Sequence, residues 1–163
     1  MSFLLYLLAC TPQPKNQIQL APESIGSAEC DVCGMLVQEQ PSPRGQLVYA
    51  DGTHAFTCSL HGLHLMARAP TPRGKPLAIY VEALSPSFDW SQMSTEPLKW
   101  ISADQAHFVA GAVRHLVMGP PLLSYADAQA AESAADRLGV RPLRWQKLFE
   151  TDDLSDLTKT NLE

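Results

Sequence analysis

Residues 46–58 read QLVYADGTHAFTC, and this stretch predicts a β-hairpin. Two short runs rich in apolar, β-branched and aromatic residues, 46–50 and 54–58, have the composition of paired strands. Between them lies Asp51-Gly52, a dipeptide typical of a tight turn that joins two antiparallel strands. We therefore expect a hairpin here.

A helix is predicted immediately after the hairpin, over residues 59–69. Leu60, Leu63 and Ala67 recur at the spacing of one helix face, and Ser59 is a suitable N-cap. Prolines from position 70 onward would end this helix. The run 77–84, LAIYVEAL, then predicts a strand.

The second half of the chain has a similar order of elements. Gly139 suits the end of an alanine-rich helix, and Pro142 places the last strand near the edge of a sheet. Because each half is predicted as strand, strand, helix, strand, we expect an α+β domain made of two related ββα-type halves, with sheets packed on helices. The elements predicted in this half are strands at 98–101, 106–110, 122–125 and 140–147, and a helix at 127–138; a short helix is the alternative for 106–110.

The composition indicates one globular domain, which we expect over residues 29–150. The chain has 163 residues, of which 45% are hydrophobic and 18% charged, with a formal net charge of −5. No basic cluster favours nucleic acid as a partner. Much of the negative charge lies at the C-terminus, where residues 151–163 are expected to form an acidic disordered tail.

The N-terminus has the pattern of a membrane anchor. Residues 3–9 are apolar and lead to Cys10, and the sequence LLAC resembles the lipobox of bacterial lipoproteins, in which the cysteine is acylated. We interpret residues 1–9 as a partial lipoprotein signal, and residues 10–28 as a lipidated cysteine and a flexible tether. An apolar N-terminus with an incidental cysteine is the alternative.

Cys33-Gly34-Met35 is the strongest candidate for a functional site. We expect a strand to begin at Met35, and two residues of one strand separated by one position would point to the same face. The thiol and the thioether would then be soft ligands suited to Cu(I). Met118 precedes a Gly-Pro loop and is a weaker candidate for a third sulfur ligand. The alternative for Met35 is a place in the apolar core.

Two other types of site remain open. Cys58 and His61, at i and i+3, could share a metal with Cys30 and Cys33, which resembles a structural zinc site of cysteine and histidine. Cys30-x-x-Cys33 is also the spacing of a redox dithiol, although strand-like residues rather than a helix follow it. A disulfide between Cys30 and Cys33 would deny Cys33 to a metal until it was reduced.

The order of these motifs resembles the NosL family, bacterial copper-binding lipoproteins associated with the assembly of nitrous oxide reductase. The pairing of an early Cys-Gly-Met with a late Met-Gly is the most specific part of the resemblance, and a lipidated cysteine ahead of the domain also fits. The matching segments are 30–35, the hairpin from Asp51-Gly52 to Phe56, 80–82, 99–103, 106–109, 118–120 and 143–145.

The resemblance implies a copper metallochaperone rather than an enzyme. Cys33 and Met35 would match the Cys-x-Met ligands, and Met118 the later methionine. Apart from what the resemblance implies, Cys30, Cys58 and His61 are possible additional ligands. The cargo would be Cu(I), delivered to a copper-accepting enzyme or its assembly factors. The protein would sit at the periplasmic face of a bacterial membrane, held by lipid on Cys10. The implied fold is similar to that of organomercurial lyase.

Overall fold

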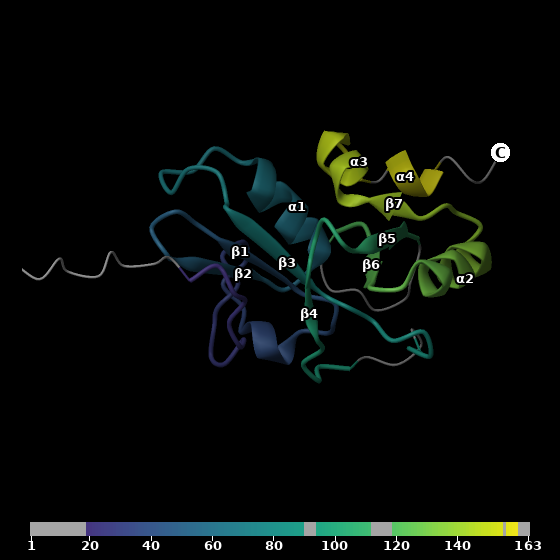
Figure 1. Cartoon of the computed structure of the whole chain (residues 1–163), viewed down its shortest axis with the longest axis horizontal. Helices are drawn as coiled ribbons and strands as arrows, with labels where there is room; N and C mark the ends of the chain where they lie inside the picture. The colour runs from purple at the N-terminus through teal and green to yellow at the C-terminus, as the bar shows by residue number, and fades with distance from the viewer. Residues whose placement is uncertain (1–18, 90–93, 112–118, 155, 160–163) are drawn as a thin grey trace, which may run out of the picture.

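Two antiparallel sheets follow one another along the long axis of the molecule in the computed structural model (Figure 1). The structure describes residues 19–89, 94–111, 119–154 and 156–159. These two antiparallel sheets and the helices between their strands confirm the prediction of an α+β fold.

The first sheet contains the predicted hairpin. Strands β1 (Gly45–Val48) and β2 (His54–Thr57) pair in antiparallel fashion, with Val48 opposite His54. The turn closes through a 2.9 Å bond in which the Tyr49 N–H donates to the Thr53 carbonyl, and Gly52 has a φ of +81°, which glycine adopts without strain. Strands β3 (Ala78–Glu82) and β4 (Trp100–Ser102) complete the order β2-β1-β3-β4.

Helix α1 (Leu60–Arg68) begins where the sequence predicts it. The Ser59 hydroxyl accepts a 3.1 Å hydrogen bond from the Gly62 N–H, which satisfies one of the free donors of the first turn. Leu60, Leu63 and Ala67 are buried against the first sheet. The helix therefore fixes the position of Cys58, two residues ahead of it.

The second half repeats the topology of the first. Strands β5 (His107–Ala110), β6 (Leu122–Tyr125) and β7 (Leu143–Arg144) form a sheet in the order β6-β5-β7, and α2 (Ala128–Leu138) lies between β6 and β7 in the chain. The order β2-β1-β3 in the first sheet is the same arrangement, with the first strand of each half in the centre. The prediction of two related halves is confirmed.

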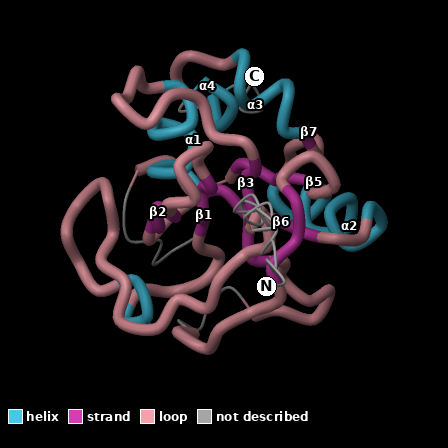
Figure 2. Tube along the Cα trace, turned by 60° about the vertical axis from the view of Figure 1, so that its left-hand side comes forward, coloured by secondary structure: helices cyan, strands magenta, loops and turns pink. Residues whose placement is uncertain are grey.

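Successive side chains of β5 point to opposite faces of its sheet, so the second half contributes to two separate apolar clusters. Phe108 belongs to the core shared with α1 and the first sheet, whereas Val109 faces the alanine-rich side of α2. Figure 2 shows α2 on the side of β5 and β6, away from α1 and α3 (Trp145–Glu150). The two sheets meet through an isolated bridge between Leu84 and Tyr125.

The last part of the chain differs from the prediction. Only Leu143 and Arg144 form the final strand, which is an edge strand as Pro142 suggests, and α3 follows directly. A disordered tail from residue 151 is also wrong for the residues described there, because Leu154 is only 1% exposed in the main core and residues 156–159 form the short helix α4 (Asp156–Lys159). Leu148 and Leu154 supply the apolar contacts that hold this segment.

The expected flexible tether extends too far toward the domain. Ile25 is 6% exposed and packs with Val37 and Phe56 on the face of the first sheet opposite to α1. The backbone of Glu23 exchanges two hydrogen bonds with the buried Gln46 side chain, at 2.9 and 3.0 Å. The domain therefore begins before residue 29. Cys10 and residues 1–18 lie outside the described residues.

A buried ion pair joins the first sheet to the loops around it. Arg44 and Glu82 are both fully buried and form two side-chain bonds, at 2.8 and 2.7 Å. Arg44 also donates to backbone carbonyls of Val37, Gln40 and Thr95. Nothing in the local sequence around Arg44 or Glu82 indicates this pair, because the two residues are 38 positions apart.

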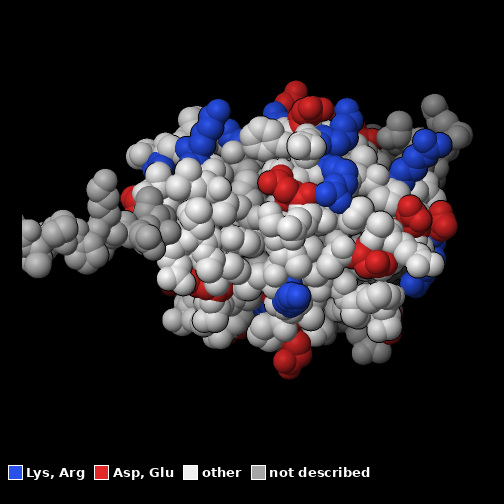
Figure 3. Space-filling view, in the orientation of Figure 1, with Lys and Arg blue, Asp and Glu red and all other residues white. Residues whose placement is uncertain are grey.

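On the face drawn in Figure 3, acidic and basic side chains are interspersed and do not gather into a basic area. Among the described residues, no helix has both the length and the apolar character that crossing a membrane would require.

The buried imidazole of His64 predicts a loss of stability in mild acid. His64 is 1% exposed, and neither of its ring nitrogens has a hydrogen-bond partner among the described residues. Burial holds the pKa of His64 below its usual 6.5, so the unfolded chain takes up a proton before the folded one does. The free energy of unfolding of the metal-free protein should therefore fall as the pH drops through about 6.5.

Urea unfolding between about pH 7.5 and 5.5 measures this effect, and the neutral His64→Leu variant should show a smaller dependence on pH. An unchanged slope in that variant would contradict the assignment to His64.

Candidate metal centre

A tight turn carries the first two cysteines of the candidate site. Glu29 and Leu36 pair as an isolated antiparallel bridge, and the Cys30 N–H donates to the Met35 carbonyl at 2.8 Å. Gly34 has a φ of +74°, which reverses the chain between Cys33 and Met35. The prediction that Cys33 and Met35 share one face of an extended strand is therefore wrong. The residues after them form the short 3-10 helix Val37–Glu39.

The end of β2 brings Cys58 to this turn. The Asp31 N–H donates to the Phe56 carbonyl, and the Phe56 N–H donates to the Asp31 carboxylate at 3.0 Å. These bonds hold the turn against the strand, and the Cys58 N–H lies 3.3 Å from the Cys30 sulfur. Two segments that are distant in sequence are thereby fixed side by side.

Three thiols converge at this place. The sulfur atoms of Cys30, Cys33 and Cys58 all lie within 4.8 Å of one another, and those of Cys33 and Cys58 are 3.5 Å apart. None of the three is in a disulfide. Cys30 and Cys58 are 3% and 4% exposed, while Cys33 is half-buried. The arrangement presents three sulfur donors to one ion.

The electrostatics of the site favour one thiolate over another. Burial raises the pKa of the Cys30 thiol, but hydrogen bonds from the backbone of Cys58, Val32 and Cys33 outweigh it, so the pKa lies below its ordinary value. Burial, together with the neighbouring thiols, raises the pKa of Cys58. The thiolate is the form that binds a metal. The lowered pKa of Cys30 favours this form, whereas Cys58 would lose its proton only when the positive charge of a bound ion stabilises the thiolate.

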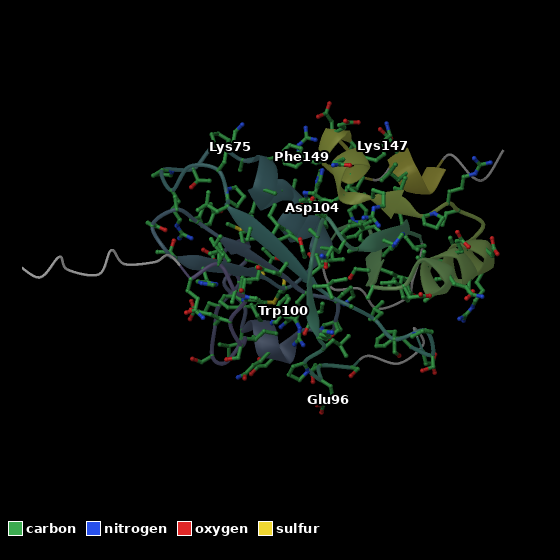
Figure 4. The ribbon with its side chains drawn as sticks, in the orientation of Figure 1. Lys75, Glu96, Trp100, Asp104, Lys147 and Phe149 are labelled. Atoms are coloured by element: carbon green, nitrogen blue, oxygen red, sulfur yellow. The ribbon has the colours of Figure 1, made fainter. Side chains whose placement is uncertain are left out.

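Met35 lies in the same apolar cluster as the cysteines. It is partly buried there beside Phe56, Ile25 and Trp100, and the last of these, labelled in Figure 4, comes from β4. The ligand and core interpretations of Met35 are thus compatible with its position. Met118 lies outside the described residues.

A small cavity adjoins the thiols. Its volume is about 170 Å³, and Cys33, Cys58, His61 and Gly119 are among the residues that line it. Gly119 directly follows Met118 in the chain, and its backbone lies against the His61 ring. A Cβ atom at Gly119 would stand 2.2 Å from His61 Cδ2, and the φ of Gly119 is +72°, so both space and backbone conformation call for glycine.

The structure thus brings together most of the residues singled out in the sequence, but the residues that lie nearest one another are not the Cys33–Met35 pair that the sequence predicts. Cys30 and Cys58, expected only as additional ligands, form the described cluster with Cys33, and His61 lines the neighbouring cavity. Cys33 lies in a turn and does not open an α-helix, whose N-terminus lowers the thiol pKa in thioredoxin-like sites; the helical residues that follow closest are the three of the 3-10 helix Val37–Glu39. Two exposed apolar side chains that also line the cavity, Val32 and Leu65, were not singled out, since isolated exposed apolar residues give no signal in a sequence.

The chain matches the family model NosL over residues 22–151. It is 32% identical over 143 residues to the copper-binding lipoprotein NosL of Stutzerimonas stutzeri, a match that covers 87% of this chain and 73% of that protein. The copper-binding lipoprotein NosL of Achromobacter cycloclastes is 30% identical over 124 residues, 72% of this chain and 61% of the relative.

The fold is similar to that in the crystal structure of the copper chaperone NosL from Shewanella denitrificans. The TM-score is 0.66 at 27% identity, over 80% of this chain and 97% of that one. The region matched by the family model contains both sheets and all three clustered cysteines, and it begins close to Ile25, where the packed part of the chain begins. The chain therefore belongs to the NosL family.

Proposed function

We propose that this protein is a metallochaperone that binds one Cu(I) ion and passes it to an extracytoplasmic copper enzyme. The convergence of three thiols within 4.8 Å is the observation that carries the proposal. Thiolate sulfur is the donor that Cu(I) prefers, and no oxygen or carboxylate ligand is needed to hold it. The relatives are named for copper binding and copper chaperoning, which agrees with a carrier and not with an enzyme.

Cys33 and Met35 are the ligands we propose first, with Met118 as a third sulfur donor and Cys30, Cys58 and His61 as additional ones. Gly119 lines the cavity beside Cys33 and Cys58, and this supports a role for Met118, one residue earlier. Thioethers are neutral and bind more weakly than thiolates, so a mixed set would allow the ion to be exchanged.

The surroundings of the thiols support exchange rather than permanent binding. Structural zinc sites are closed by four protein ligands that leave no open position. Here Cys33 and Cys58 border a cavity of about 170 Å³, which has room for a ligand from an acceptor. A small domain with a structural zinc site is therefore the less favoured function.

We propose further that Cys10 carries a lipid anchor that keeps the domain at the periplasmic face of a bacterial membrane. The relatives named as lipoproteins support this. The acceptor we propose is nitrous oxide reductase or a factor of its assembly, which follows from the family and from the cargo.

Metal analysis of the reduced full chain tests this function. One equivalent of Cu(I) should bind in competition with a chromophoric Cu(I) chelator, and should displace any Zn(II) carried through purification, because soft thiolates favour Cu(I). Tight retention of one Zn(II) ion in the presence of excess Cu(I) would contradict the proposal and favour the structural zinc site.

A further inference from the structure

We propose that the empty thiol site is a redox switch, in which Cys33 and Cys58 join as a disulfide that closes the site to copper and whose reduction reopens it. The consequence for copper rests on the proposed function, because it concerns the same three sulfurs. Three observations support the switch: the separation of the sulfurs, which of them the cavity reaches, and how the two segments are held.

The two sulfurs that would bond are already close. Those of Cys33 and Cys58 are 3.5 Å apart, and neither is in a disulfide. A disulfide bond is about 2.05 Å long, so the two atoms need to approach by only about 1.5 Å. An approach on this scale needs side-chain adjustment and no change in the sheet.

The cavity beside the thiols reaches the same pair. Cys33 and Cys58 both line this cavity of about 170 Å³, whereas Cys30 is not among the described residues that line it. Cys33 is half-buried and Cys58 is 4% exposed. A small oxidant therefore reaches Cys33 first, and Cys58 is the adjacent thiol that completes the bond.

Cys30 is held in a different way. Its sulfur accepts a 3.3 Å hydrogen bond from the Cys58 N–H, and the residue is only 3% exposed. This bond occupies the Cys30 sulfur on the side away from the cavity. The disulfide thus joins the two segments, and is not the bond within the turn that the spacing Cys30-x-x-Cys33 suggests.

Hydrogen bonds already hold the two segments together. The Asp31 N–H donates to the Phe56 carbonyl, and the Phe56 N–H donates to the Asp31 carboxylate at 3.0 Å. These bonds fix the turn that carries Cys33 against the strand that leads to Cys58. Little conformational freedom is left to lose when the disulfide forms, so the fold should be the same in both redox states.

The step is a thiol–disulfide exchange with a small disulfide, R–S–S–R, as the oxidant. The Cys33 thiolate attacks one of its sulfurs, and RS⁻ leaves and takes up the proton that Cys33 gave away. Cys58, as its thiolate, then attacks the Cys33 sulfur of the mixed disulfide, and the second RS⁻ leaves and takes up the Cys58 proton. Two cysteine thiols are oxidised, and one small disulfide is reduced to two thiols. A dithiol reductant reverses both steps by attacking Cys33, the more accessible member of the pair.

The disulfide removes two of the three clustered donors. A disulfide sulfur carries no charge and does not replace a thiolate as a ligand for Cu(I). A bound ion occupies the same sulfurs, so a loaded chain keeps its thiols while an empty one is oxidised. The switch thereby distinguishes the empty carrier from the loaded one.

Mapping the disulfide tests the pairing. Reduced, metal-free full chain, made without lipidation, is incubated with oxidised glutathione, its remaining thiols are alkylated, and it is cleaved before Asp31, which separates Cys30 from Cys33. The chain should lose two thiols, the peptides that carry Cys33 and Cys58 should be joined, and Cys10 and Cys30 should be alkylated. Any other pairing, or four alkylated cysteines, would overturn the inference.

The same reaction in urea is the matched control for the role of the fold. In the unfolded chain, closeness in sequence should decide, because short loops cost the least entropy to close, and the bond between Cys30 and Cys33 should become the main product. A Cys33–Cys58 bond that formed equally well in urea would show that the folded site does not select this pair, and would also overturn the inference.

Cu(I) binding is then compared between the two redox states after small thiols have been removed. In competition with a chromophoric chelator, the oxidised chain should bind Cu(I) more than about 100-fold more weakly than the reduced chain, because changes merely next to a metal ligand already cost roughly 10–100-fold. Treatment with dithiothreitol, followed by its removal, should restore the affinity. Equal affinities in the two states would contradict the switch.

The failure of this inference differs from the failure of the proposed function. Reduced wild-type protein that does not bind Cu(I) contradicts the proposed function, and with it the consequence of the disulfide for copper. Normal Cu(I) binding by the reduced chain, with thiols that stay free or pair differently under oxidised glutathione, contradicts the inference alone.

Discussion

Replacing Cys33 by serine is expected to lower the affinity of the chain for Cu(I) by more than about 100-fold, because changes merely next to a metal ligand already cost roughly 10–100-fold. Cys33 is the common member of both proposed ligand groups, the Cys-x-Met pair and the three-thiol cluster. Its sulfur lies 3.5 Å from that of Cys58, so its loss removes one of the three donors of the cluster. A serine hydroxyl is a hard ligand and does not replace a thiolate for Cu(I).

Competition with a chromophoric Cu(I) chelator measures this affinity. Cys58→Ser should also weaken binding, and Met35→Leu should do so to a smaller extent, since a neutral thioether contributes less than a thiolate. Cys10→Ser, made in chain expressed without lipidation, is the matched control, because it makes the same chemical change far from the cluster in sequence, and its Cu(I) affinity should equal that of the wild type. Because Cys33 is half-buried and serine is close to it in size, thermal unfolding should confirm that the fold is retained. An unchanged affinity in Cys33→Ser would rule out this metal centre.

Neutralising Glu82 should cause the largest loss of stability of any single substitution considered for this chain. Glu82 and Arg44 are both 0% exposed, and the carboxylate accepts from the Arg44 side chain and from the backbone N–H groups of Arg44 and Leu98. Glu82→Gln keeps the shape and removes the charge, which leaves a buried guanidinium without its counter-ion. Breaking a buried pair in this way costs about 3–5 kcal/mol, a large part of the total of about 5–15 kcal/mol that stabilises most domains.

Urea unfolding at neutral pH measures the loss. Glu132→Gln makes the same chemical change at an exposed position of α2 and should alter the free energy of unfolding by no more than about 0.5 kcal/mol. The double variant Arg44→Met with Glu82→Leu should recover part of the stability lost in Glu82→Gln, because it removes both buried charges together. A loss below about 1 kcal/mol in Glu82→Gln would show that water or a rearranged loop compensates the arginine.

Local sequence signals predicted the elements and their order well. The Asp51-Gly52 turn, the Ser59 N-cap and Gly139 at the end of α2 each act through a few neighbouring residues, and each has the expected geometry. The repeat of strand, strand, helix, strand was also visible, because apolar periodicity follows from which face of each element is buried. These features need no information from distant parts of the chain.

The metal centre and the buried ion pair could not be predicted from local sequence, because their residues lie far apart in the chain. In the sequence, Cys33-Gly34-Met35 predicts two sulfurs on one strand, but the positive φ of Gly34 and the bond from Cys30 to Met35 turn the chain between them. Cys58, 25 residues after Cys33, comes within 3.5 Å of it, sulfur to sulfur, because the turn is bonded to β2. Arg44 gave no sign in the sequence that its partner would be Glu82, 38 residues later.

The sequence alone therefore determined the soft-ligand chemistry of this protein, the order of its elements and, through its motifs, its family. Only the tertiary structure decided which sulfurs meet, where the cavity opens, and which charges are buried. The physical reason is that capping, turn formation and amphipathic periodicity are local interactions, whereas a metal centre built from two segments exists only after the sheet has paired and its faces have been covered.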